Sequence, residues 1–292
     1  MGVAGTGRLG GMADPRIAEF LRNRRSRVTP AQAGLPDGLT RRRVPGLRRE
    51  EVAQLAGVSV DYYTRLEQGR GKHVSDAVLD AIATVLRLSH VERQHLWNLA
   101  RPRATAGPPP ARAVPPGVRR MLELMPDAPA LVLGRRMRVL AWNPAAQAVF
   151  DVESMRELGY NAARHAFLAP RAAERYVNRE EVAAAICAQL RLESGRHPDD
   201  PDLAALIGEL AIRSGTFRRL WAANDVRQKD SGTTVVAHPV VGRLEFGYEA
   251  LALPGAGDQY LTAYTYPAGS ATAQRLQLLL SWTSEPAPVG TA

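Results

Sequence analysis

Hydrophobic residues recur at helical spacing on both sides of a glycine between Arg49 and Gln68. The apolar positions of the two halves are Val52, Leu55 and Ala56, followed by Tyr62, Tyr63 and Leu66. The i, i+3, i+4 spacing is that of a buried helical face. Gly57 lies between the halves, where a turn through positive φ costs glycine little, and Ser59 is a suitable N-cap. The pattern predicts a helix, a tight turn and a second helix.

This pair of helices has two interpretations. An ordinary antiparallel helix pair around a glycine shows the same spacing. A helix-turn-helix, whose second helix enters the DNA major groove, also needs a small residue where its helices cross, and Ala53 is suitably placed. The basic surroundings and the two further helices that follow favour DNA binding.

The other patterns predict two domains. Apolar spacing indicates one helix over about 15–27, another that begins at Ser75 or Asp76, and a third that begins at Ser89. A polar loop is expected over 29–46. Residues 14–104 are therefore predicted to form an all-α, five-helix domain, which follows a flexible tail over 1–13. Five prolines between Gly107 and Pro116 predict a linker over 105–117. The second domain, 118–284, precedes a tail over 285–292.

The second domain is predicted to be α+β. Strands are expected at 130–134, 137–142, 233–237, 243–253 and 259–266. Helices are expected at about 118–124, 145–150, 171–193, 201–213, 215–224 and 271–282. The short links between strands favour an antiparallel sheet, and the order of elements resembles a PAS-like sheet with a helical insert.

Charge separates the two domains. Residues 1–105 hold 18 Arg or Lys and 10 Asp or Glu, whereas the remaining residues hold 20 and 19. A basic excess confined to one domain is typical of a phosphate-binding module. The chain has one cysteine, Cys187, and neither a signal peptide nor a run of eighteen apolar residues, so we expect a cytoplasmic protein with no membrane partner.

Two sets of residues in the first domain are candidates for DNA contact. Early exposed positions of a recognition helix face base edges, and here they are Val60, Asp61, Thr64 and Arg65. Asp61 has three open roles: accepting from cytosine, orienting an arginine, or stabilising the helix N-terminus. Phosphate contact is expected from Arg48, Arg49, Arg70, Lys72, Arg41, Arg42 and Arg43, the last three forming either an arm or a charged loop.

Catalytic and metal chemistry are not indicated. The segment HPDDPD (197–202) brings a histidine near three aspartates, but its prolines favour a polar turn and a helix cap over a metal site. His165 and His238 are isolated, and Cys187 lies in an apolar stretch where a buried thiol is the default. No nucleophile elbow, phosphate-binding loop or trusted carboxylate pair is present, so we expect neither an enzyme nor a bound cofactor.

Longer tracts carry a family resemblance. Residues 16–100, with GLRREEVAQLAGVSVDYYTRLEQGR at 46–70, resemble the XRE class of helix-turn-helix regulators. LAWNPAAQAVF (140–150), SGTFRRLWAANDV (214–226), HPVVGRLEFGYEAL (238–251) and YLTAYTYPAGS (260–270) resemble the ligand-binding domain of MmyB-like regulators. The segment 151–160 fits that pattern less clearly.

The resemblance implies a bacterial, nucleoid-associated transcription regulator whose second domain senses a small apolar, fatty-acid-like ligand. Candidate apolar wall residues are Leu131, Leu133, Trp142, Phe150, Phe167, Phe217, Trp221, Phe246, Tyr264 and Tyr266, each of which is also an ordinary core residue. Asn161, Arg164, Arg191 and His238 are candidates to meet a carboxylate. The expected partners are a double-stranded DNA operator and a second copy in a homodimer. In the alternative interpretation, the second domain is a ligand-free dimerisation or protein-interaction scaffold.

Overall fold

The structure is a computed structural model that describes residues 15–35, 46–70, 74–101, 113–170, 172–223, 230–282 and 289–291, with backbone alone at 172 and 173. The chain divides into two compact units, Met1–Ala104 and Thr105–Ala292, which we describe separately. Most of the predicted linker, and the whole predicted N-terminal tail, lie outside the described residues.

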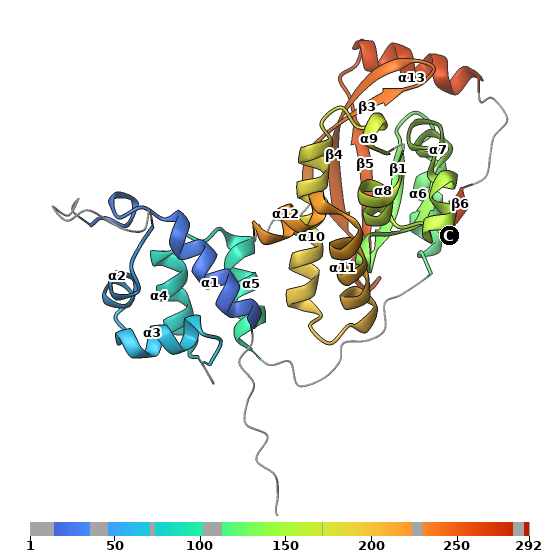
Figure 1. The fold of residues 1–292 in the computed structure, drawn as a ribbon. Coiled ribbons are helices and arrows are strands. Elements are labelled where there is room, and N and C mark those ends of the chain that lie inside the picture. The colour runs from blue at the N-terminus through green and yellow to red at the C-terminus, as the bar shows by residue number, and fades with distance from the viewer. Residues whose placement is uncertain are drawn as a thin grey trace, which may run out of the picture. The chain divides into compact units, whose positions relative to one another are not determined.

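The described part of the N-terminal unit is helical (Figure 1). Its elements are α1 (Pro15–Arg27), η1 (Ala31–Ala33), α2 (Arg49–Leu55), α3 (Val60–Glu67), α4 (Asp76–Val85) and α5 (His90–Ala100). They enclose one apolar core in which Phe20, Val52, Tyr63, Ile82 and Leu96 are almost completely buried. The all-α prediction is therefore confirmed, with α1 at its expected bounds.

Local signals set the ends of these helices. Gly57 has φ of +67° between α2 and α3, as its place in the pattern predicts. The hydroxyls of Ser59, Ser75 and Ser89 accept from backbone N–H groups three residues further on, so each caps its helix. Two expected core positions are wrong: Leu55 is 38% and Tyr62 36% exposed, because each lies at the edge of the buried face of its short helix and not at its centre.

The C-terminal unit is built on a sheet in which each strand pair is antiparallel, in the order β3-β4-β5-β1-β2-β6. The strands are β1 (Ala130–Gly134), β2 (Arg138–Trp142), β3 (Ser231–His238), β4 (Gly242–Ala252), β5 (Tyr260–Thr265) and β6 (Gly290–Thr291). The antiparallel prediction is confirmed. The expected C-terminal tail needs correction, since Gly290 and Thr291 pair with β2 and form the last strand of the sheet.

Helices cover both faces of the sheet (Figure 1). Around the sheet lie α6 (Pro116–Glu123), α7 (Pro144–Phe150), α8 (Ala162–Leu168), α9 (Ala172–Arg175), α10 (Arg179–Arg196), α11 (Pro201–Arg213), α12 (Gly215–Ala222) and α13 (Ala271–Trp282), with 3-10 turns η2 (Arg135–Met137) and η3 (Val152–Leu158). Alternating side chains of β1 separate two cores. Leu131 and Leu133 face the larger core with α7, α10 and α11, whereas Ala130 and Val132 pack with Leu122 of α6.

Two helical predictions needed correction. The expected helix over 171–193 is two helices, α9 and α10, because Tyr176 and Val177 leave the helix to bond strand β3. The turns of 152–168 were missed, since η3 and α8 are each only seven residues long and carry weak periodicity. Of the helices that the structure describes, none combines the length and apolar character that a membrane span requires.

Candidate nucleic-acid interface and ligand cavities

The α3 helix presents the predicted base-reading residues on its exposed side. Val60 is 43% exposed, Asp61 and Arg65 are exposed, and Thr64 is partly buried. Arg65 Nη2 lies 2.8 Å from Asp61 Oδ2, one helical turn away. Asp61 is thus placed to orient Arg65 even without DNA. Base contact by these four residues stays a prediction.

A buried carboxylate holds this helix in place. Glu67, on the inner side of α3, is 1% exposed. One of its oxygens accepts from Arg25 Nε of α1 at 2.6 Å, and the other accepts from Arg49 Nε of α2. Arg25 also donates to the carbonyl of Leu47 at 2.7 Å. One carboxylate therefore joins three helices and sets the angle at which the exposed side of α3 is presented.

This pairing refines the predicted phosphate contacts. Arg49 already holds Glu67 and is 43% exposed, so its guanidinium has a structural duty besides any contact with DNA. Arg48 and Arg70 are exposed at the start of α2 and just after α3, as phosphate contact requires. The remaining four predicted residues, Arg41, Arg42, Arg43 and Lys72, lie outside the described residues.

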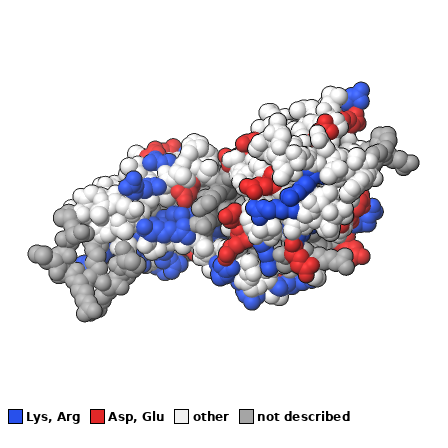
Figure 2. All heavy atoms as spheres, turned by 90° about the horizontal axis from the view of Figure 1, so that it is seen from above, with Lys and Arg blue, Asp and Glu red and all other residues white. Residues whose placement is uncertain are grey.

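Charge is distributed differently over the two units. In Figure 2, basic side chains lie close together on the visible face of the N-terminal unit, whereas basic and acidic side chains alternate over the C-terminal unit. This distribution agrees with the sequence, in which nearly all of the net positive charge belongs to residues 1–105. A basic surface attracts the phosphate backbone independently of base sequence.

Two hollows lined by described residues lie between the sheet and α10 in the C-terminal unit. The larger one, which we call the Tyr176 hollow, measures about 540 Å³ including space open to solvent. Its lining residues are Leu131, Leu133, Met137, Val139, Phe150, Met155, Ala162, His165, Ala166, Tyr176, Val182, Ile186, Thr234 and Tyr264. Burial lowers the pKa of His165 and raises that of Tyr176 to about 12, so both side chains are neutral near pH 7.

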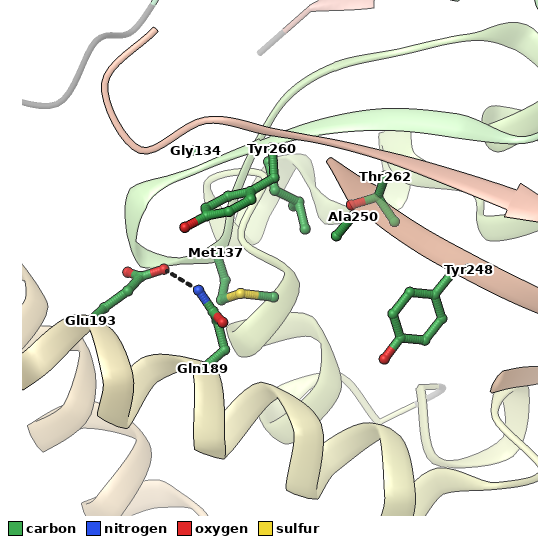
Figure 3. A pocket seen from close by; sticks show the side chains of 9 residues that line it. Gly134, Met137, Gln189, Glu193, Tyr248, Ala250, Tyr260 and Thr262 are labelled. Atoms are coloured by element: carbon green, nitrogen blue, oxygen red, sulfur yellow. Dashed lines mark hydrogen bonds between the residues drawn. The ribbon is translucent and has the colours of Figure 1, made fainter. Parts of the chain in front are cut away.

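The second one, which we call the Glu193 hollow, measures about 390 Å³ by the same count. It is lined by Leu133, Gly134, Met137, Gln189, Glu193, Tyr248, Ala250, Tyr260 and Thr262. Figure 3 shows Gln189 and Glu193 on one helix, facing the strand β5 that carries Tyr260 and Thr262. Leu133 and Met137 line both hollows, so the two lie on either side of these side chains.

The aromatic residues predicted for the pocket mostly belong to the packed core. Phe150 and Tyr264 line the Tyr176 hollow, as do the wall candidates Leu131 and Leu133. Phe217 instead stacks on Trp221, with Phe167 edge-on to it, in a cluster of helices. Trp142 stacks on Tyr160, and Phe246 packs against Tyr264 and Tyr266. Apart from Tyr264, the rings of these two clusters and of Trp142 line neither hollow.

The four polar candidates for a ligand carboxylate each have local partners in the structure, and their contact with a ligand stays a prediction. Asn161 caps α8 and donates to the carbonyl of Arg136. Arg164 pairs with Glu209 at 2.8 Å, and Arg191 donates to the carbonyl of Trp221 beneath its ring. His238 contacts the Ala148 carbonyl through Nε2 and accepts from Val240 and Val241 through Nδ1, in line with a role at the sheet edge. Each of the four side chains thus has a hydrogen-bond or ion-pair partner within the protein.

Sequence reasoning missed the polar side chains that do line a hollow. Gln189 and Glu193 lie four residues apart, on one side of a helix, inside the stretch VAAAICAQLRLE, whose only other polar residue is Arg191. Both are at most 5% exposed, and Gln189 Nε2 donates to Glu193 Oε1 at 3.3 Å. Two polar residues at i, i+4 within a buried helix are a recognisable signal, because buried polar groups need partners.

The segment HPDDPD forms the expected turn and helix cap. Asp200 accepts from the backbone of Leu203 and starts α11. His197 lies 3.1 Å from Asp258, and Asp200 also pairs with Arg136. Among the residues that the structure describes, no three His, Cys, Asp or Glu side chains are grouped as a metal site would require.

Comparison with known families agrees with both halves of the chain. A family model of helix-turn-helix domains matches residues 16–96. The model described as the MmyB-like transcription regulator ligand binding domain matches residues 114–279, which is more than half of the chain. A search of curated proteins finds no match. With a helix-turn-helix unit followed by that domain, the chain belongs to the MmyB-like transcription regulators and is a DNA-binding regulator with a ligand-binding domain.

Proposed function

We propose that this regulator binds an elongated apolar, fatty-acid-like molecule in its C-terminal domain, and that occupancy changes its affinity for operator DNA. The observation that carries the proposal is the pair of hollows sharing Leu133 and Met137 inside the core. Methionine is unbranched and adaptable, so rotation of Met137 opens a continuous path for a chain-like ligand. As they stand, both hollows are narrow, with room for one or two water-sized molecules, so a ligand is expected to widen them as it enters.

The proposal includes a homodimer on a palindromic operator. A helix-turn-helix reads a few base pairs, and two copies that bind half-sites one helical turn apart double the contacts. A ligand alters this binding only by favouring one of two states of the protein, since equal affinity for both shifts nothing. Ligand and DNA affinity are therefore expected to change by the same factor, in reciprocal fashion.

The ligand prediction is tested by native mass spectrometry of the intact purified chain. We expect the mass of a dimer plus a retained organic molecule, which denaturation releases. Operator binding measured by gel shift is expected to change when that molecule is stripped and restored. A dimer that carries no extra mass, and whose operator affinity is the same before and after extraction with organic solvent, would favour the scaffold interpretation.

The DNA prediction concerns Arg65 on the exposed side of α3. Arg65→Ala should reduce discrimination between operator and random DNA by about 1–3 kcal/mol, because a bidentate arginine–guanine contact is lost. Gel shifts with both DNAs at two salt concentrations measure the effect. The matched control is Arg70→Ala, in which a phosphate contact is removed: both DNAs should be bound more weakly and the salt slope should flatten. Unchanged discrimination in Arg65→Ala would mean that α3 docks differently.

A further inference from the structure

We propose that the Glu193 hollow selects a ligand whose polar end donates hydrogen bonds, such as an alcohol or an amine, over one that ends in a carboxylate. The inference rests on the proposed ligand-binding function and narrows it: the ligand keeps the long apolar chain of a fatty acid, but its polar end is a hydrogen-bond donor and not a carboxylate. It assigns the polar end to this hollow and the apolar chain to the Tyr176 hollow, whose lining is uncharged.

The first observation is the chemistry of the lining. Among the described residues that line the two hollows, Glu193 is the only Asp, Glu, Lys or Arg. The side chain is 5% exposed, and its oxygens accept from the backbone N–H of Arg136 at 2.6 Å and from Gln189 Nε2 at 3.3 Å. A carboxylate has about four acceptor positions, so two N–H donors leave room for a donor from the ligand.

The second observation is an unpartnered hydroxyl in the same hollow. Thr262, on β5, is 1% exposed, and its Oγ1 has no hydrogen-bond partner. A buried polar atom without a partner costs free energy, so such atoms in native proteins call for an explanation. Figure 3 places Thr262 across the hollow from Gln189 and Glu193. A ligand hydroxyl or amine between them satisfies both sides.

Electrostatics decide against a ligand carboxylate. Burial raises the pKa of Glu193 to about 7, although the Arg136 and Gln189 bonds and His197 oppose this, while Asp258 adds to it. At pH 8 Glu193 is therefore largely ionised, and a second carboxylate beside it forms a like-charge pair. None of the described residues that line this hollow is an arginine or lysine. The nearby Arg196 lies outside the lining and donates to the Tyr260 hydroxyl at 3.2 Å. An alcohol or ammonium gains a charge-assisted hydrogen bond instead.

The test uses three ten-carbon probes, 1-decanol, decylamine and decanoate, with the intact protein at pH 8. Binding is measured by displacement of the neutral fluorophore N-phenyl-1-naphthylamine. We expect the alcohol and the amine to bind about tenfold or more tightly than decanoate. Glu193→Gln removes the charge but keeps the shape, so decanoate should gain affinity and the amine should lose it. Glu180→Gln is the matched control, an exposed glutamate on the same helix, and should leave the ranking unchanged.

A second variant, Thr262→Val, keeps the inference testable if Glu193→Gln fails to fold. Thr262→Val keeps the volume and removes the hydroxyl, and should weaken alcohol and amine binding about fivefold, whereas Thr265→Val, on the exposed side of the same strand, should not. Tightest binding of decanoate, or a ranking that Glu193→Gln leaves unchanged, would overturn the head-group inference alone. If neither the fluorophore nor any of the three probes binds, the proposed ligand-binding function fails with it.

Discussion

Replacing Glu67 by glutamine is expected to lower the free energy of unfolding of the N-terminal unit by about 2–4 kcal/mol. Breaking a buried ion pair by removing one partner typically costs about 3–5 kcal/mol. Here Arg25 is largely buried but Arg49 is 43% exposed, so solvent screens part of the loss. The glutamine amide still accepts from one arginine, and the other is left beside a neutral group. Because the same residue orients α3, operator affinity should fall with stability.

Hydrogen exchange of the α3 amides in the intact chain measures this effect without interference from the second unit. A loss of about 3 kcal/mol corresponds to exchange faster by roughly two orders of magnitude. Asp76→Asn is the matched control, because it removes an ion pair to Arg101 in which both partners are more than half exposed. Such pairs contribute about 0–1 kcal/mol. Equal effects of the two variants would mean that the carboxylate of Glu67 does not hold the helices together.

Replacing Asn143 by alanine is expected to destabilise the C-terminal unit by about 3–5 kcal/mol. The side chain is fully buried and makes four hydrogen bonds to the backbone. Its oxygen accepts from Ala130 at 3.0 Å and Ala146 at 2.9 Å, and its nitrogen donates to Met125 at 2.7 Å and Ala128 at 2.8 Å. Alanine leaves these groups unsatisfied, at about 1 kcal/mol or more each, and removes the N-cap of α7.

Urea unfolding followed by tryptophan fluorescence checks this result, since Trp142 is adjacent and buried. The comparison variant is Asn161→Ala. Asn161 also caps a helix, but its side chain makes only two backbone bonds, so a loss of about 1–2 kcal/mol is expected. A loss below 1 kcal/mol for Asn143→Ala, or the same loss for both variants, would contradict the account of Asn143 as the link between α6, β1 and α7.

Elements with strong local signals were predicted closely. The helix over 201–213 has a proline in its first turn, an aspartate cap and clear apolar spacing, and its bounds in the structure are the expected ones. Likewise β4 shows alternation along its length, with Leu244, Phe246 and Tyr248 on the buried side. Signals of this kind act within one turn of a helix or one strand, so they are readable without knowledge of the rest of the chain.

The partners of charged residues were not predictable in the same way. Glu67 lies 42 residues from Arg25 and 18 from Arg49, and their spacing in the sequence does not indicate that the three side chains meet. The local partners of the polar candidates in the second domain were unpredictable for the same reason. Arg164 and Arg191 were selected as residue types suited to bind a carboxylate, but Glu209 and the Trp221 carbonyl already occupy them.

The sequence by itself determined the two-domain order, the helix-turn-helix with its glycine turn and serine cap, the antiparallel sheet and the family, because periodicity, capping and motifs are local properties. Only the tertiary structure decided which face of α3 is exposed, which carboxylate holds it, and which side chains line the hollows. Gln189, Glu193 and Thr262 come from a helix and a strand about 70 residues apart. Their meeting depends on how the α10 helix packs on the sheet, and packing is a property of the whole fold.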